Sequence, residues 1–177
     1  MNEIVNPLSG ERIVIQDRVA GEAPLTWDLY LEPGGRVPSS HAHPRQRESF
    51  TVLAGSMRFT ISGRRRTVAV GERITVEPGV VHAFANAGRD TAHVLVETSP
   101  ALEMAALLEA AAELAKEQQA AARAYPRLVD LALFMGEFDQ EVRAPVLPAL
   151  ARLSMRAVAA SARWTGRDGR YRRLRQR

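Results

Sequence analysis

Two of the four histidines in this 177-residue chain stand one residue apart, in the stretch HAHPRQRESF. They are His41 and His43, and Glu48 follows five residues after the second. Residues two apart in a β-strand share a face, so both imidazoles are expected to point the same way. With a carboxylate on the next strand, they would form a set of ligands for a divalent cation.

A further candidate ligand, His82, lies downstream in the stretch GVVHAFAN. Three imidazole nitrogens and one carboxylate oxygen suit one divalent transition metal, Fe, Mn, Ni, Co or Zn, whereas Ca²⁺ prefers oxygen ligands. The alternative interpretation is that these histidines are unrelated surface residues on loops. The local spacing of the histidines does not decide between the two interpretations.

The composition is that of a soluble globular protein, with 46% apolar and 25% charged residues. The chain has no cysteine, which excludes disulfides, thiolate metal sites and a cysteine nucleophile. No apolar run approaches the ~20 residues needed to span a bilayer. The N-terminal stretch also lacks the regions of a signal peptide, so we expect a cytoplasmic protein.

The pattern of apolar residues changes near residue 98. Residues 1–98 contain short alternating or apolar stretches between turn residues, which predicts a β-sandwich or small barrel. Residues 99–177 have helical periodicity, with a helix start at Ser99-Pro100, an interruption at Pro126 and a last helix from Pro148 to about Trp164. We therefore expect two parts, a barrel and a helical extension with a basic tail.

The glycines around the histidines form two spaced motifs. The first motif comprises Gly35, His41, His43, Glu48 and Gly55. The second comprises Gly71, Gly79, His82 and Asn86, and 15 residues separate Gly55 from Gly71. Together these motifs resemble the two signature motifs of the cupin family. One position departs from the second motif, because Glu77 stands where the family usually has proline, and we expect Glu77 to be a solvated turn residue.

The resemblance implies a mainly β fold, a double-stranded β-helix or jelly roll, followed by the α-helical extension. It also implies a metal ion held by His41, His43, Glu48 and His82. Some cupins use this glutamate as a base, so Glu48 is also the candidate catalytic residue. The resemblance implies no particular reaction, because cupins include enzymes of several classes, binding domains and storage proteins.

Residues on the same strand faces as the candidate ligands would line a substrate pocket. These are Phe50, Val52, Phe59, Phe84 and Asn86. Any of them could instead belong to the barrel core. Few polar groups are expected to face inward, and Arg45 and Arg47 are expected at the rim. The pattern favours a small, partly apolar or aromatic ligand.

Two functions are consistent with this pattern. The first is a metal-dependent, dioxygenase-like oxidoreductase. The alternative is a non-catalytic cupin that binds a metal or small ligand, whose helical extension serves oligomerisation or contact with a partner. Family resemblance also suggests a homodimer through the edge strands of the barrel.

The basic charge is concentrated at the C-terminal end. Residues 152–177 contain nine arginines and one acid, which gives +8, so residues 1–151 must carry −4 to reach the net +4. We expect no nucleic acid partner, because the helices show no helix-turn-helix signature. Contact of the tail with an anionic membrane is the less favoured alternative to its docking on the acidic remainder of the protein.

Overall fold

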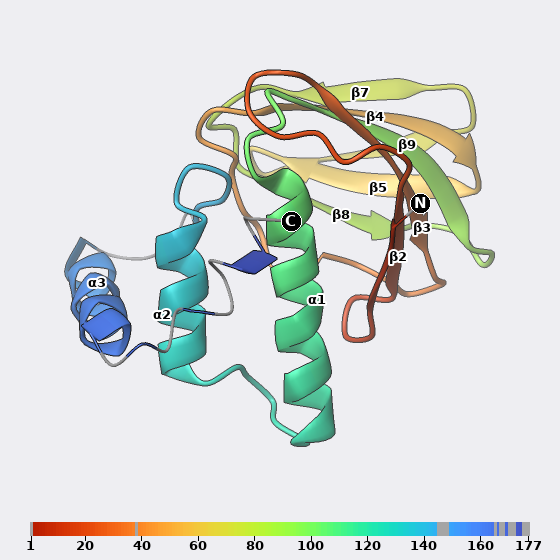
Figure 1. The fold of residues 1–177 in the computed structure, drawn as a ribbon. Helices are drawn as coiled ribbons and strands as arrows, with labels where there is room; N and C mark the ends of the chain where they lie inside the picture. The colour runs from red at the N-terminus through yellow and green to blue at the C-terminus, as the bar shows by residue number, and fades with distance from the viewer. Residues whose placement is uncertain are drawn as a thin grey trace.

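The computed structural model describes residues 2–37, 39–144, 149–164, 166, 169, 173 and 174. Within them the chain forms two antiparallel sheets followed by helices (Figure 1). The larger sheet contains, in spatial order, β1 (Asn2–Asn6), β2 (Glu11–Ile15), β3 (Leu25–Leu31), β9 (Ala92–Ser99), β4 (Arg47–Ala54) and β7 (Arg73–Val76). The smaller sheet contains β6 (Arg64–Ala69), β5 (Ser56–Ile61) and β8 (His82–Asn86).

The period-two pattern of the strands places one face of each sheet in a common core. In β3, Leu29 and Leu31 are fully buried, while Thr26 is exposed. In β5, Met57 and Phe59 are fully buried and belong to the same hydrophobic cluster. The mainly β jelly roll with a helical extension is therefore confirmed.

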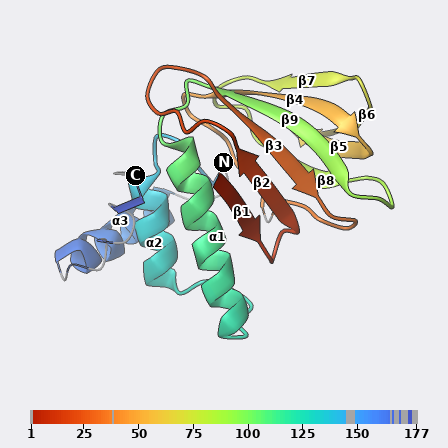
Figure 2. The same ribbon diagram turned by 45° about the vertical axis from the view of Figure 1, so that its right-hand side comes forward.

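Strand β1 was not predicted, because its few residues mix polar and apolar side chains without a clear pattern. It pairs with β2, where Ile4 lies opposite Ile13, and both residues are buried. Figure 2 shows helix α1 (Met104–Ala120) running beside this edge of the larger sheet. The tertiary contact with the helix thus gives β1 an apolar partner that its own sequence does not indicate.

The helical extension continues with α2 (Leu128–Glu137) and α3 (Ala149–Trp164). The predicted interruption at Pro126 lies between α1 and α2, and the last helix ends at Trp164 as predicted. Pro148, where that helix was expected to begin, lies outside the described residues. Within the described part of the chain, no helix is both long and apolar enough to cross a membrane.

The predicted helix start at Ser99-Pro100 is wrong. Ser99 is still part of β9, where it lies opposite Arg47 of β4. The N–H groups of Ala101 and Leu102 then donate hydrogen bonds to the carbonyls of residues 23 and 21. Leu102 also has a left-handed φ of 46°, which a right-handed helix does not contain, so α1 begins only at Met104.

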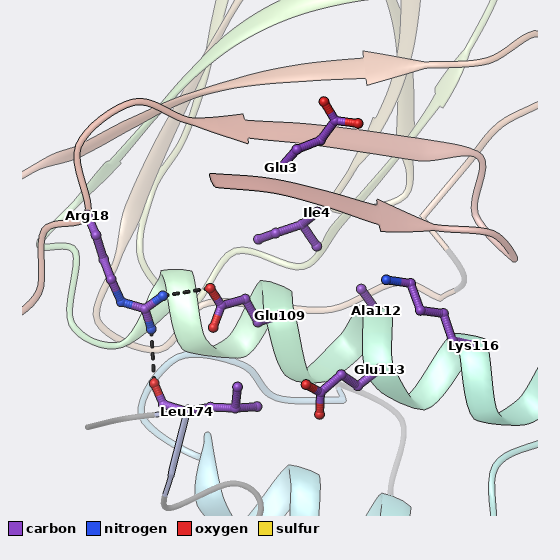
Figure 3. A pocket seen from close by; sticks show the side chains of 8 residues that line it. All are labelled: Glu3, Ile4, Arg18, Glu109, Ala112, Glu113, Lys116 and Leu174. Carbon is purple, nitrogen blue, oxygen red and sulfur yellow. Dashed lines mark hydrogen bonds and ion pairs between the residues drawn. The ribbon is translucent and has the colours of Figure 1, made fainter. Parts of the chain in front are cut away.

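The described part of the basic tail lies against α1. The guanidinium of Arg18 donates to Glu109 Oε1 at 2.7 Å and to the carbonyl of Leu174 at 3.0 Å (Figure 3). The side chain of Leu174 is buried. The predicted tail arginines at positions 170, 172, 175 and 177 lie outside the described residues, as do the side chains of Arg152 and Arg156.

Candidate metal centre

The candidate ligands come from three segments that the backbone brings together. His82 begins β8, and its N–H and carbonyl exchange hydrogen bonds of 2.8 and 2.9 Å with those of His41. The N–H of Gly79 donates to the carbonyl of His43 at 2.8 Å, in a turn where Gly79 has a φ of 77°. The segment that carries the first two histidines is thus fastened along β8, while Glu48 enters from β4.

The candidate ligand atoms of His41, His43, Glu48 and His82 all lie within 4.8 Å of one another. Glu48 Oε2 lies 3.1 Å from His43 Nε2 and 3.2 Å from His82 Nε2. His41 is partly exposed, whereas the other three residues are buried. The four residues that the sequence motifs grouped as candidate ligands therefore do lie together in the fold, and this group could hold a metal ion.

Each of the three imidazoles has its Nδ1 atom next to a backbone carbonyl. The distances are 3.1 Å from His41 to the Ser39 carbonyl, 2.5 Å from His43 to the Glu141 carbonyl and 3.1 Å from His82 to the Val80 carbonyl. A carbonyl oxygen only accepts, so each Nδ1 is the protonated donor. The lone pair of a neutral ring is then on Nε2, as is usual for histidines that bind metals.

The centre has buried polar atoms that the protein itself does not satisfy. His43 Nε2 and His82 Nε2 have no hydrogen-bond partner among the described residues, although Glu48 Oε2 lies at ion-pair distance. Leaving such an atom unsatisfied costs about 1–3 kcal/mol. A cation placed among these nitrogens and the carboxylate would remove that cost, so the residues present fit a metal ion.

The electrostatics separate the four groups. Burial, with repulsion from the other two imidazoles, lowers the pKa of His41 to about 3, so this ring is neutral. Burial would also lower the pKa of His43, but the Glu48 charge and the Glu141 carbonyl outweigh it and raise that pKa. Burial would raise the pKa of Glu48, yet His43 and His82 hold it well below its usual range. Glu48 is therefore held as an anion, and its charge favours the protonated form of His43.

A second layer of side chains supports Glu48. Thr98 Oγ1 lies 3.4 Å from Glu48 Oε1 and donates to it, and Trp27 Nε1 donates to Thr98 Oγ1 at 3.4 Å. All three side chains are buried. Strands β3, β9 and β4 are adjacent in the sheet, so the sheet register itself places this chain of contacts behind the carboxylate.

The predicted pocket residues fall into two groups. Phe50, Phe59 and Phe84 pack together, with ring centroids 5.0–6.0 Å apart, and the Phe50 centroid lies 6.4 Å from that of His82. Val52 is fully buried in the same hydrophobic cluster. The structure thus places the four apolar residues in the barrel interior, and the Phe50 ring nearest the histidines.

Asn86 is placed differently. Its amide nitrogen donates to the carbonyls of Leu31 and Asp90, each at 2.8 Å, and its amide oxygen accepts from the Gly88 N–H at 2.7 Å. All of these partners are backbone groups. The side chain therefore holds the turn between β8 and β9 against β3.

The arginines at the rim are engaged with acids. Arg45 lies 3.5 Å from Glu22, and Arg47 lies 3.5 Å from Glu77. Glu77 is a largely exposed turn residue, as predicted. Neither rim arginine is thus directed at the histidines.

Two residues with a role at this centre were missed by the sequence analysis. Glu141, in the loop that follows α2, supplies the carbonyl partner of His43. Gln46 donates from its buried amide to the carbonyls of Pro100 and Ala101. Glu141 is 98 residues from His43 in the sequence, and Gln46 is 54 and 55 residues from its two partners. No local spacing of residues could therefore have indicated either contact.

The sequence of the barrel matches a known family. Residues 27–97 match the family model described as the cupin domain. No curated protein sequence matches the chain.

Solved structures similar to this chain include the cupin domain of Schizosaccharomyces pombe Cnp3, with 12% identity and a TM-score of 0.49, covering 56% of this chain and 68% of that one. KdgF from Halomonas sp. has 18% identity and a TM-score of 0.49, covering 56% of this chain and 88% of that one. A protein with a double-stranded β-helix domain from Klebsiella pneumoniae has 22% identity and a TM-score of 0.46, covering 55% and 79%. At these identities the similarities say nothing about a reaction.

Proposed function

The barrel of this chain belongs to the cupin family, and we propose that it binds one divalent transition-metal ion and acts as a metal-dependent, dioxygenase-like oxidoreductase. Its substrate would be a small molecule that is partly apolar or aromatic. The metal would be Fe, Mn, Ni, Co or Zn, and the oxidoreductase activity requires one of the redox-active members of that set.

One observation carries the metal-binding half of the proposal. The ligand atoms of three imidazoles and one carboxylate lie within 4.8 Å of one another, and each ring is fixed by a carbonyl behind its Nδ1 atom. His41, His43, Glu48 and His82 would hold the ion. When bound, such an ion supplies Lewis acidity and, for a redox-active metal, electron transfer.

The role that we propose for Glu48 follows from its surroundings. Its carboxylate is ionised, and Thr98 donates to Oε1 while Oε2 faces the histidines. Oε2 is thus the oxygen that would hold the ion and that, once the carboxylate detaches from the ion, would accept a proton from a substrate bound beside the centre. The Thr98 hydroxyl would keep the carboxylate plane oriented while that proton is held.

The substrate class is inferred from charge and from the neighbouring aromatic rings. A small dianion needs a positioned cation such as arginine, and the two rim arginines are paired with Glu22 and Glu77. Phe50 lies nearest the imidazoles among the aromatic residues of the core. These features favour a ligand with one polar, chelating end and an apolar body.

The test starts from protein purified without a metal-affinity column and stripped with a chelator. It is reloaded separately with Fe, Mn, Co, Ni and Zn, and O₂ consumption is measured against a panel of small aromatic and enolic compounds. We expect turnover with a redox-active metal, and we expect His82→Ala to abolish it. A wild-type protein that binds metal and ligand but consumes no O₂ with any metal would reject the oxidoreductase.

One observation favours the alternative, a non-catalytic cupin that binds a metal or small ligand. Phe50 and Phe59 are fully buried and pack on Phe84, as a barrel core does. The helical extension would then serve oligomerisation or contact with a partner. In either function we propose a homodimer formed at the edge strands of the barrel, which light scattering of the full chain would detect.

A further inference from the structure

The helical extension reaches the candidate metal centre through one loop. Residues 138–143 follow α2, and Phe138 at their start is fully buried, with its ring centroid 5.3 Å from that of Phe134. The N–H groups of Glu141 and Val142 both donate to the Phe138 carbonyl, at 3.1 and 2.9 Å. This loop is therefore compact and anchored to the core of the extension.

The same loop pairs with the segment that carries the histidines. Ala42 and Arg143 form an antiparallel bridge with two backbone hydrogen bonds, of 3.0 and 2.8 Å. Between them, the Glu141 carbonyl accepts from His43 Nδ1 at 2.5 Å. The position of the His43 ring thus depends on the position of this loop.

The Glu141 side chain ties the loop to the beginning of α1. Its Oε1 accepts from the backbone N–H of Glu103 at 3.2 Å, and the residue is almost completely buried. On the other side, Gln46 donates to the carbonyls of Pro100 and Ala101, at 3.2 and 2.8 Å. The junction between barrel and extension is therefore fastened to the histidine segment from both directions.

His43 differs in this respect from the other two histidines. The carbonyl partners of His41 and His82 belong to residues only two positions away, Ser39 and Val80. The carbonyl partner of His43 is 98 residues away and lies in the extension. Displacement of the loop would therefore leave two of the rings in place and release the third.

We propose that Glu141 is a positioning residue for the metal centre, and that the helical extension is a structural part of that centre. The inference rests on the proposed metal-binding function. Glu141 holds the loop against the start of α1, and the loop holds the imidazole of His43 with Nε2 toward the other ligands. Groups that orient a ligand histidine typically change metal affinity by about 10–100-fold when they are lost.

The experiment measures Co(II) binding to the full-length protein after removal of endogenous metal. Glu141→Ala removes the contact with Glu103, and Glu141→Gln keeps an acceptor oxygen at the same place. The matched control is Glu109→Ala, which breaks another contact between extension and barrel, the ion pair with Arg18 at 2.7 Å. Affinity is measured by competition with a chromophoric chelator. Proton NMR of the Co(II)-loaded protein follows the shifted Nδ1–H signals.

We expect Glu141→Ala to weaken Co(II) binding by roughly 10–100-fold and to speed exchange of the His43 Nδ1–H with water. The Nδ1–H of His82 should be unchanged. Glu141→Gln and Glu109→Ala should both bind within about threefold of the wild type, since neither loses the support for His43. A general loss of stability would not weaken Co(II) binding in Glu141→Ala while leaving it unchanged in Glu109→Ala.

Two results would overturn the inference in distinguishable ways. A folded Glu141→Ala protein with wild-type affinity and unchanged exchange at His43 refutes the positioning role but leaves the metal centre intact. A wild-type protein that binds no Co(II) refutes the metal centre and the inference with it. If Glu141→Ala does not fold by circular dichroism, Arg143→Pro replaces it. Proline removes the N–H donated to Ala42 and restricts the backbone of the loop, so it displaces the loop from the histidine segment. Wild-type affinity in that variant would also refute the proposal.

Discussion

His43 Nε2 lies 3.1 Å from Glu48 Oε2, and both side chains are almost completely buried. The carboxylate raises the pKa of His43, while His43 and His82 lower the pKa of Glu48 despite the opposing effect of burial. The raised pKa favours a protonated imidazole in the metal-free protein, whereas a metal ion requires a neutral one. The cation and this proton compete for the same site.

Metal binding should therefore release a proton. The pKa of His43 is raised above its ordinary value of about 6.5, so the ring is protonated below the raised value and loses a proton when the ion binds. The apparent Kd should rise about tenfold for each pH unit below that pKa. Calorimetric titration with Zn(II) in buffers of different ionisation enthalpy gives the number of protons directly. An affinity independent of pH in this range contradicts the prediction.

His82→Ala should lower metal affinity at least ~100-fold while the barrel stays folded. The matched control is His93→Ala, since His93 is the remaining histidine and lies outside the centre. It pairs with Asp28 at 2.7 Å and stacks on Tyr30, so its loss should cost about 1 kcal/mol of stability and no affinity. Metal content and denaturant unfolding of both variants test this. Equal metal loss in both would point to a site elsewhere.

Acid should destabilise the metal-free protein through His41. Its folded-state pKa is about 3, below the ordinary value. Between these two values His41 is protonated in the unfolded chain and neutral in the folded protein. This contribution to stability is therefore complete above about pH 6.5 and is lost as the pH falls toward the folded-state value, with a slope of at most about 1.4 kcal/mol per pH unit. In the His41→Gln variant, the free energy of unfolding should depend less on pH between these two values. Parallel curves for variant and wild type would refute the assignment.

Phe84→Leu tests whether the aromatic cluster touches a ligand. Phe84 lies two residues from His82 and packs on Phe50. A core role predicts a loss of up to about 1.5 kcal/mol in stability and no change in KM or ligand affinity. Contact with a ligand predicts that KM rises as well. Met57→Leu, a fully buried residue of β5, is the control expected to change stability alone.

Truncation after Gly166 should reduce stability and leave binding to anionic surfaces unaffected. It removes Leu174, whose side chain is buried and whose carbonyl accepts from Arg18. Burial of a leucine is worth about 1.5–3 kcal/mol. Leu174→Ala, which keeps the arginines, should reproduce most of the loss. Light scattering and vesicle or nucleic acid binding across a range of salt complete the test. Salt-sensitive binding that disappears on truncation would show that the tail serves an external partner.

Much of the barrel and the candidate centre could be predicted because both depend on short-range patterns. Alternation in LTWDLYL specifies which face of β3 is buried, since successive side chains in a strand point to opposite faces. The spacing of His41, His43, Glu48 and His82 relative to the glycines was sufficient to group them. The start of α1 was predicted wrongly, because β9 continues through Ser99 and Leu102 has a left-handed φ of 46°.

The amino-acid sequence by itself therefore determined the strand faces, the position of the helical extension and the set of four candidate ligands. Only the tertiary structure decided how those ligands are oriented. Ser39 and Val80 orient their histidines from within the same segment, but Glu141 orients His43 from 98 residues away. A contact between distant segments is made by packing of the whole chain, so it leaves no periodicity or spacing to read. For that reason the link between extension and metal centre appears only in the folded protein.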